Sequence, residues 1–210
     1  MKLRADLHVH SEFSFDSKSK INKILKKAKK EKIDILAITD HEEFLGGEKL
    51  KNLSKELIVI CGEEIDTEYG DIIGLFLTKK IETKKFFEVI KEIKKQKGIA
   101  VIPHPSIHHI LTDEVLNSID LIEIFNSRVG NSGNEMAKML ANKIKKPGIA
   151  GSDAHFLFEI GNGITLIDSK SKNIEDIKAA LQMGNVELLC KRSPKLKRYW
   201  AKFVKIWRRR

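Results

Sequence analysis

The sequence predicts an α/β fold, in which buried strands alternate with amphipathic helices. Three observations indicate it: short apolar runs typical of buried strands, intervening stretches with apolar residues at helical spacing, and groups of histidines and acids that follow the strands. Repeated β-α units favour a parallel sheet with helices outside it. This many units in one domain permits a barrel as well as a doubly wound sheet.

Eight apolar runs are expected to form strands, namely residues 4–9, 34–38, 57–61, 71–77, 99–102, 119–125, 149–151 and 163–167. Runs such as DILAI and IAVI are apolar throughout, as in strands that are covered on both faces. Four stretches are expected to form helices because they carry one apolar face, namely residues 21–31, 84–97, 134–145 and 174–183. Without an internal repeat or a low-complexity linker, we expect one domain at residues 1–190 and a distinct tail at 191–210.

The positive charge of the chain is concentrated in that tail. The net charge is +10, but ten of the 39 Lys and Arg residues lie in 191–210 without any acid, which leaves 29 bases against 29 acids elsewhere. The lysine-rich runs at 26–32 and 91–97 are therefore interpreted as solvated helix faces. The beginning of the chain, MKLRADLHVH, lacks the apolar run of a signal peptide, and no run approaches the ~20 apolar residues of a membrane span. These features predict a cytoplasmic protein, and the distant Cys61 and Cys190 indicate neither a disulfide framework nor a thiolate metal site.

The segment DLHVHSEFSFDS, residues 6–17, alternates apolar and polar residues as a strand does. Because successive side chains of a strand point to opposite faces, Asp6, His8 and His10 are expected on one face and Leu7 and Val9 on the other. The apolar face can join the core. The polar face requires another explanation.

Four later segments repeat this arrangement of histidines and acids after a predicted strand: ITDHE (38–42), CGEEI (61–65), IPHPS (102–106) and GSDAH (151–155). In α/β folds, ligands bind at the carboxyl ends of the strands. A single histidine there is more often a structural residue than a ligand, but five such segments favour one shared site. So many imidazoles and carboxylates without a cation would be costly to bury, which predicts two or three divalent metal ions.

Taken in order, DxHxH, TDH, GxE, HP and SDAH resemble the motifs of the PHP (polymerase and histidinol phosphatase) family of metal-dependent phosphoesterases, over about residues 6–155. The resemblance implies a distorted (β/α)7 TIM-like barrel. It also implies the metal ligands: His8, His10 and Asp153 for a first ion, Glu64 bridging to a second that also takes His104, and Asp16, His41 and His155 for a third. Glu63 competes with Glu64, and the GxE spacing favours Glu64. Some branches have a further histidine on the strand after HP, where this chain has EIFN (123–126).

The expected chemistry follows from charge. Bound cations offset the repulsion between a phosphate ester and a nucleophile, so we expect in-line attack by a metal-bound hydroxide without a serine or cysteine nucleophile. Nitrogen and oxygen donors without thiolates suit Zn, Mn or Fe better than Mg. Arg128, with Asn126, is the candidate substrate contact, because a guanidinium can clamp a phosphate; a solvent-facing loop residue is the alternative. Asp6 is expected to orient a ligand histidine, and Asp40 either does the same or stabilises a turn.

The substrate remains open at this level. A nucleotide-like or other small phosphate monoester is the first hypothesis, and 5′–3′ exonuclease or phosphodiesterase action on short oligonucleotides is the second. A non-catalytic RNA-binding barrel is the third, and the intact ligand set argues against it. In the tail, Leu196, Tyr199/Trp200, Phe203 and Trp207 recur at spacings of three to four, which predicts a basic amphipathic helix. That helix could dock on the barrel itself, on a membrane surface or on nucleic acid.

Overall fold

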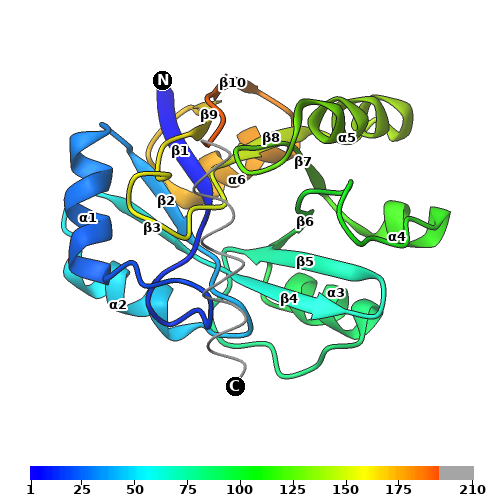
Figure 1. Cartoon of the computed structure of the whole chain (residues 1–210), viewed down its shortest axis with the longest axis horizontal. Helices are drawn as coiled ribbons and strands as arrows, with labels where there is room; N and C mark the ends of the chain where they lie inside the picture. Colours follow the sequence, from blue (N-terminus) through cyan, green and yellow to red (C-terminus); the bar gives the residue numbers. More distant parts are fainter. Residues whose placement is uncertain (194–210) are drawn as a thin grey trace.

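The computed structural model describes residues 1–193, which form an α/β structure (Figure 1). The strands are β1 (Lys2–Val9), β2 (Ile35–Ile38), β3 (Ile58–Cys61), β4 (Glu63–Thr67), β5 (Gly70–Leu75), β6 (Ile99–Ile102), β7 (Leu121–Asn126), β8 (Gly148–Gly151), β9 (Gly163–Asp168) and β10 (Val186–Cys190). The helices are α1 (Ile21–Lys30), α2 (Leu45–Leu53), α3 (Phe86–Lys95), α4 (Asp113–Ser118), α5 (Asn131–Ile144) and α6 (Ile174–Gln182). The predicted tail helix lies at residues outside those described. No helix within residues 1–193 is long and apolar enough to cross a bilayer.

The strands form two five-stranded sheets, in the orders β10-β9-β1-β2-β3 and β4-β5-β6-β7-β8. The α/β class is confirmed, but no closed barrel is detected among the described residues. The β1–β2, β2–β3, β6–β7 and β7–β8 pairs are parallel, whereas the β1–β9, β9–β10, β4–β5 and β5–β6 pairs are antiparallel. Two isolated parallel bridges, Val9 to Ala154 and His41 to Glu64, join the sheets at their two seams.

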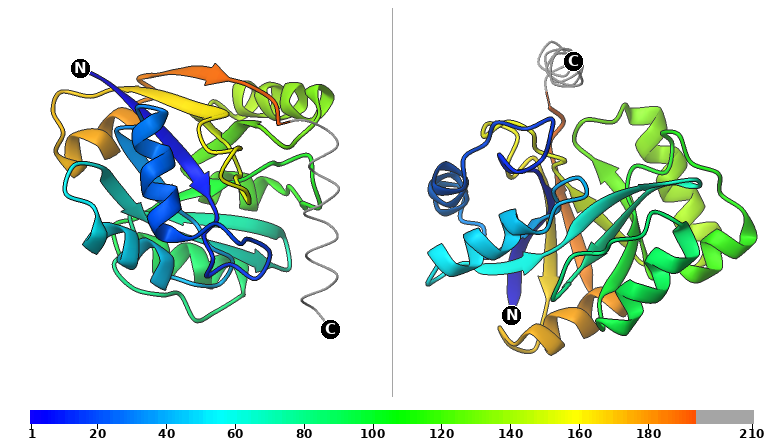
Figure 2. Two further views of the ribbon diagram at one scale, coloured as in Figure 1. Left: turned by 60° about the vertical axis from the view of Figure 1, so that its left-hand side comes forward. Right: turned by 90° about the horizontal axis from the view of Figure 1, so that it is seen from below.

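Apolar side chains fill the space between the sheets and cover their outer faces. Leu7, Ile60 and Leu121 belong to a central cluster that includes residues of both sheets, and α6 packs into it through Ile177 and Leu181. Helices α1 and α2 pack outside the first sheet, and α3, α4 and α5 pack outside the second (Figures 1 and 2). The layers are therefore helix, sheet, core, sheet and helix.

Strand β1 does not keep the simple alternation that its sequence predicts. Its register with β2 shifts between Asp6 and Val9. As a result Leu7 lies in the central cluster, whereas Val9 lies in the outer cluster with α1 and α2. Such an irregularity re-aims the side chains that follow it. His8 and His10 therefore face the inside together, and Asp6 does not share their surroundings.

Two helices and two strands were not predicted: α2, α4, β4 and β10. Helix α2 has the sequence LGGEKLKNL, whose two glycines disfavour a helix. A Cβ at Gly46 would lie 2.0 Å from Asp40 Oδ2 and 2.6 Å from Ser11 Oγ, so the helix needs a glycine to approach these residues. Tight packing against the site loops thus overrides local propensity.

The close approach of β8 and β9 predicts a large effect of one methyl group. A Cβ at Gly163 would lie 2.1 Å from the carbonyl oxygen of Gly151, and backbone atoms cannot move aside as a side chain can. We expect Gly163→Ala to lower the free energy of unfolding by roughly 3 kcal/mol, the upper end for overpacking. Gly130→Ala is the control, because a Cβ there meets nothing within 4 Å; it should cost less than about 1 kcal/mol. Urea unfolding of both variants measures the difference, and equal effects would contradict this account.

Candidate metal centre

The predicted ligands lie in one cluster of imidazoles and carboxylates, near the carboxyl ends of several strands. Most follow strand ends: His10 after β1, His41 after β2, His104 after β6, and Asp153 and His155 after β8. His8 and Glu64 differ, because they lie within β1 and β4. Three overlapping groups of donor atoms fit metal sites, each with all atoms within 4.8 Å of one another: His10, Asp16, His41 and His155; His8, His10 and Asp153; His8, Glu64 and His104.

Glu64 occupies the centre of the cluster. Its Oε2 lies 3.1 Å from His8 Nε2 and 3.2 Å from His10 Nε2, and its Oε1 lies 3.1 Å from His104 Nε2. The side chain is 1% exposed. Burial opposes its charge, but the neighbouring imidazoles, with His8 foremost, outweigh burial and hold the pKa of Glu64 well below its usual value. Glu64 is therefore an anion that several nitrogen donors share.

The group of His8, His10 and Asp153 fits a cation by the closeness of its donor atoms. His8 Nε2 and His10 Nε2 lie 3.1 Å apart, and Asp153 Oδ1 lies 3.7 Å and 3.5 Å from them. Two imidazole lone pairs at that distance repel each other unless a proton or a cation lies between them. Nitrogen and carboxylate donors converging on one point are typical of zinc and related transition metals.

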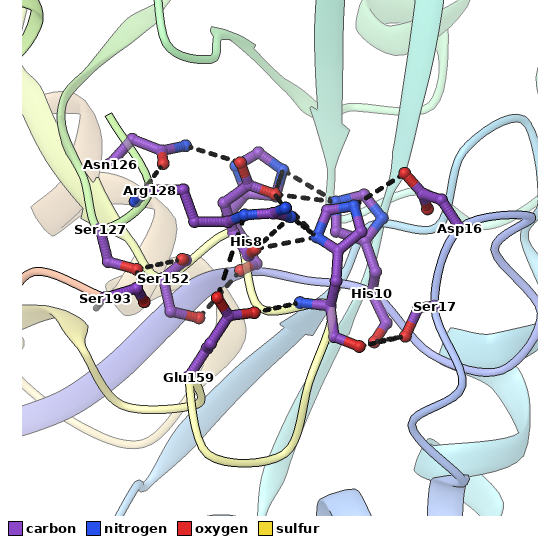
Figure 3. Close-up of polar contacts among 12 residues, drawn as sticks. His8, His10, Asp16, Ser17, Asn126, Ser127, Arg128, Ser152, Glu159 and Ser193 are labelled. Atoms are coloured by element: carbon purple, nitrogen blue, oxygen red, sulfur yellow. Dashed lines mark hydrogen bonds and ion pairs between the residues drawn. The ribbon is translucent and has the colours of Figure 1, made fainter. Parts of the chain in front are cut away.

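The group that contains Asp16 is held by the loop that follows β1. Asp16 Oδ2 lies 2.8 Å from His155 Nε2 and 3.5 Å from His41 Nε2. Ser17 Oγ donates to the carbonyl oxygens of both His10 and His155, at 3.1 and 3.0 Å (Figure 3). Burial opposes ionisation of Asp16, but the charge and hydrogen bond of His155 lower its pKa. The loop thereby fastens an acid to two histidines from other strands.

Glu123 is a site residue that sequence reasoning noted only as a departure from the family pattern. Its Oε1 accepts from His8 Nδ1 at 3.0 Å, and its Oε2 accepts from the backbone N–H of His104 at 2.9 Å. A carboxylate on the far nitrogen of a ligand histidine fixes the tautomer and orientation of the ring. The signal in the sequence was an acid at an inward position of an otherwise apolar strand.

Asn126 and Arg128 lie next to this shell. The Asn126 amide donates to Glu123 Oε2 at 2.9 Å and to Asp153 Oδ2 at 3.2 Å, and the residue is fully buried. Its contacts support a positioning role, and its predicted substrate contact remains a prediction. The Arg128 guanidinium contacts His155 Nδ1 and lies 3.7 Å from Asp153 Oδ1, and its Nε lies 4.0 Å from Glu159 Oε1.

The carboxylates of Asp6 and Asp40 accept hydrogen bonds from backbone N–H groups of neighbouring loops. Asp6 accepts from the N–H groups of Ser152 and Gly161, at 3.0 and 2.8 Å, and Asp40 accepts from the Ser11 hydroxyl at 2.6 Å. No described hydrogen bond joins either carboxylate to the ring of a candidate ligand histidine. That Asp6 orients such a ring therefore stays a prediction, and the hydrogen bonds described for its carboxylate go to the backbone of Ser152 and Gly161. Burial raises the pKa of Asp6 to about 6, against the effect of these hydrogen bonds.

Two candidate ligands have strained backbones. His104 has φ of 29° and Asp153 has φ of 52°, in the left-handed region that L-residues other than glycine rarely adopt. Such conformations persist where the surrounding structure over-determines them, and they are concentrated at functional sites.

Comparison with known proteins agrees with this geometry. The sequence profile of the PHP domain matches residues 6–104, and a PHP-associated profile matches residues 131–186. The chain is 32% identical to the uncharacterized protein MJ0417 of Methanocaldococcus jannaschii, over 94% of this chain and 87% of that protein. It is 40% identical to MJ1587 of the same organism, over 60% of this chain and 82% of that protein.

A solved structure shows the same fold. A two-domain protein from Bacteroides vulgatus that contains a predicted PHP-like metal-dependent phosphoesterase superposes with a TM-score of 0.80 and 18% identity, over 96% of this chain and 70% of that one. Because the two profiles together match most of the chain, the chain belongs to the PHP family.

Neighbouring acids on β4 provide a matched test of the central ligand. Glu64 faces the histidines, whereas Glu63 Oε2 accepts from the backbone N–H of Ile81 at 3.0 Å. We expect Glu64→Gln to lower metal affinity by about 100-fold or more, since loss of a partner outside the ligand shell already costs 10–100-fold. Glu63→Gln should change it only a few-fold, because the amide oxygen can still accept from Ile81. Titration against a chelating dye compares them, and the reverse order would make Glu63 the ligand.

Metal affinity is also expected to depend on pH. Burial lowers the pKa of His104, but the hydrogen bond and charge of Glu64 outweigh it and raise that pKa to about 9. In the metal-free protein this imidazole holds its proton up to that pH, and a metal must displace the proton. The apparent affinity should therefore rise by about tenfold per pH unit for each displaced proton between pH 6.5 and 9. Calorimetry in buffers of different ionisation enthalpy measures the released protons; a flat profile would contradict the assignment.

Proposed function

We propose that this protein is a metal-dependent phosphoesterase that hydrolyses phosphate esters, with small nucleotide-like or other phosphate monoesters as its first substrate class. The observation that carries the proposal is the overlap of three donor groups, which share His8 and His10. Overlapping groups can hold neighbouring cations that act on one phosphoryl group. Bound divalent cations supply Lewis acidity toward the phosphoryl oxygens and a nucleophilic water at neutral pH.

We assign eight residues to hold the cations: His8, His10, Asp16, His41, Glu64, His104, Asp153 and His155. The donor atoms are nitrogen and carboxylate oxygen without thiolate, which favours Zn, Mn or Fe over Mg. The set favours bound cations through its negative charges, because Asp16, Glu64 and Asp153 all have lowered pKa values. Glu123 and Asn126 orient His8 and Asp153 through the hydrogen bonds described above.

Arg128 is assigned to the substrate phosphate. Its guanidinium lies beside two candidate ligands, Asp153 and His155, and its side chain is 15% exposed. A cation in this position can contact a phosphoryl oxygen that also approaches the metal site, and its planar fork suits two oxygens at once. The buried carboxylate of Glu159 lies 4.0 Å from Arg128 Nε, which holds the guanidinium toward the cluster.

Hydrolysis of p-nitrophenyl phosphate, nucleotides and bis-p-nitrophenyl phosphate tests the proposal. Chelator-treated protein is reloaded with Mn, Zn, Fe or Mg and compared with His10→Ala and Asp153→Ala. Both variants should lose about 100-fold or more of the metal-dependent turnover, because each removes a donor from the shared groups. His108→Asn is the control, since His108 is exposed, lies outside the groups and has a positive φ that asparagine tolerates. A metal-loaded, folded protein without turnover on any ester would overturn the proposal.

A further inference from the structure

The imidazole of His109 lies outside the three donor groups, and both of its nitrogen atoms face the backbone. His109 Nε2 lies 2.9 Å from the carbonyl oxygen of Asp71 on β5, and Nδ1 lies 2.5 Å from that of Ile107. Nearby, the Ile110 N–H donates to the carbonyl oxygen of Tyr69 at 2.9 Å. These contacts fasten the loop that follows β6 to the hairpin of β4 and β5.

The sequence explains why a side chain contacts β5 at this point. In the β5–β6 pair, Ile73 lies opposite Val101. The same register would place Asp71 opposite Pro103, which has no N–H to donate. The strand β6 ends before that proline. The His109 ring therefore takes the place of a strand residue as the partner of the Asp71 carbonyl oxygen.

The loop also lies directly against the backbone of Gly70, at the start of β5. Gly70 has φ of 108°, and a Cβ there would lie 2.7 Å from His109 Cδ2 and 2.8 Å from the carbonyl oxygen of His108. The space between the hairpin and the His109 ring is too small for a methyl group. The position of this ring is therefore fixed by the hairpin as well as by its own loop.

His104, at the other end of the loop, depends on such constraints. Its φ of 29° is strained, and strained residues persist only where the surrounding structure over-determines them. Its Nε2 lies 3.1 Å from Glu64 Oε1. A ligand imidazole is usually oriented by a hydrogen bond at its second nitrogen, as Glu123 does for His8. His104 Nδ1 has no such partner among residues 1–193, so its ring must be oriented in another way.

The His109 ring contacts the His104 ring. Their centroids lie 5.8 Å apart with 62° between the ring planes, an edge-to-face arrangement that aromatic rings favour. His104 is only 9% exposed, so few other orientations are open to it. A ring that the hairpin holds in place thus limits the orientation of the candidate ligand.

We propose that His109 is a positioning residue, which holds His104 toward its cation site through a hydrogen bond from His109 Nε2 to the Asp71 carbonyl oxygen. The inference rests on the metal centre of the proposed function and adds to it a residue from outside the donor groups. The contact with Asp71 joins two elements of the fold, whereas the contact with Ile107 stays within one loop. The first of these contacts is therefore the one that positions the loop.

Two amide variants separate the two nitrogen atoms. The amide nitrogen of Gln replaces Nε2 and can donate to Asp71, whereas that of the shorter Asn replaces Nδ1 and reaches Ile107. Titration with Co(II), followed by its visible absorption, measures the affinity and the ligands of the ion without any turnover. His109→Asn should weaken binding of the ion that needs His104 by about tenfold or more, as expected for a lost partner outside the ligand shell. His109→Gln should stay within about threefold of the unchanged chain.

A double-mutant cycle shows whether His109 acts through His104. In the His104→Ala background, His109→Asn should cause no further loss of Co(II) affinity, because the ligand that it positions is gone. A general structural role would lower the affinity equally in both backgrounds. His108→Asn is the matched control, since His108 is exposed in the same loop, and it should change neither the affinity nor the spectrum.

Nitrogen NMR of the unchanged chain gives a measurement that needs no substitution. Long-range ¹⁵N–¹H correlations should show a proton on His109 Nε2, the atom that faces Asp71. A ring protonated at Nδ1 alone would overturn the proposal. Equal Co(II) affinities of the two amide variants, or equal losses in the two backgrounds of the cycle, would also overturn it.

Hydrolysis assays keep this proposal apart from the proposed function. If no ester is hydrolysed with any metal but the cycle gives the expected result, the proposed function fails and the role of His109 stands. If esters are hydrolysed but the effects of the two substitutions are independent, the role of His109 fails and the proposed function stands. A chain that binds no Co(II) or other divalent cation would overturn both.

Discussion

The structure depends on the electrostatic balance around Glu64. A carboxylate that is 1% exposed would be costly to ionise alone, yet the imidazoles of His8, His10 and His104 lie within 3.2 Å of it and stabilise its charge. The same imidazoles crowd one another and need a proton or a cation between them. Without Glu64 these imidazoles would lose the anion that they share. Without bound cations, only protons could separate their lone pairs. The cluster therefore fits metal ions and constrains the strands that supply it.

Two register shifts in the strands and two isolated bridges between the sheets bring the side chains of this cluster together. A shift in β1 turns His8 and His10 inward, and a shift in β7 between Glu123 and Phe125 leaves Asn126 able to reach Glu123. The isolated bridges at Val9–Ala154 and His41–Glu64 bring the two sheets together where the candidate ligands lie. Regular alternation would have separated these side chains. The local departures from ideal strand geometry are thus the means by which the sheets form one site.

Around the cluster, a second set of polar contacts holds the candidate ligands and the loops that carry them. Glu123 orients His8, Glu159 lies behind Arg128, and Asp6 and Asp40 hold the loops that carry the other donors. Ser127, between Asn126 and Arg128, hydrogen-bonds to Ser193 through its backbone and its hydroxyl group. The candidate metal ligand Asp153, Arg128 and Ser193 are therefore neighbours in space, although Ser127 and Ser193 are 66 positions apart in the chain.

The sequence by itself determined the α/β class, the family and the eight candidate metal ligands, because periodic apolar runs and closely spaced histidine and acid motifs are local features. It also placed most of these ligands at strand ends, which the structure confirms. Only the tertiary structure decided that the strands form two sheets with four antiparallel pairs. The direction of a strand depends on how it is connected to its neighbour, as in the short connection between β4 and β5. It likewise decided that Asp6 faces the Ser152 and Gly161 backbone, that Glu123 orients His8, and that Gly46 permits α2. These outcomes depend on a register shift and on contacts between distant residues, which no local pattern in the sequence encodes.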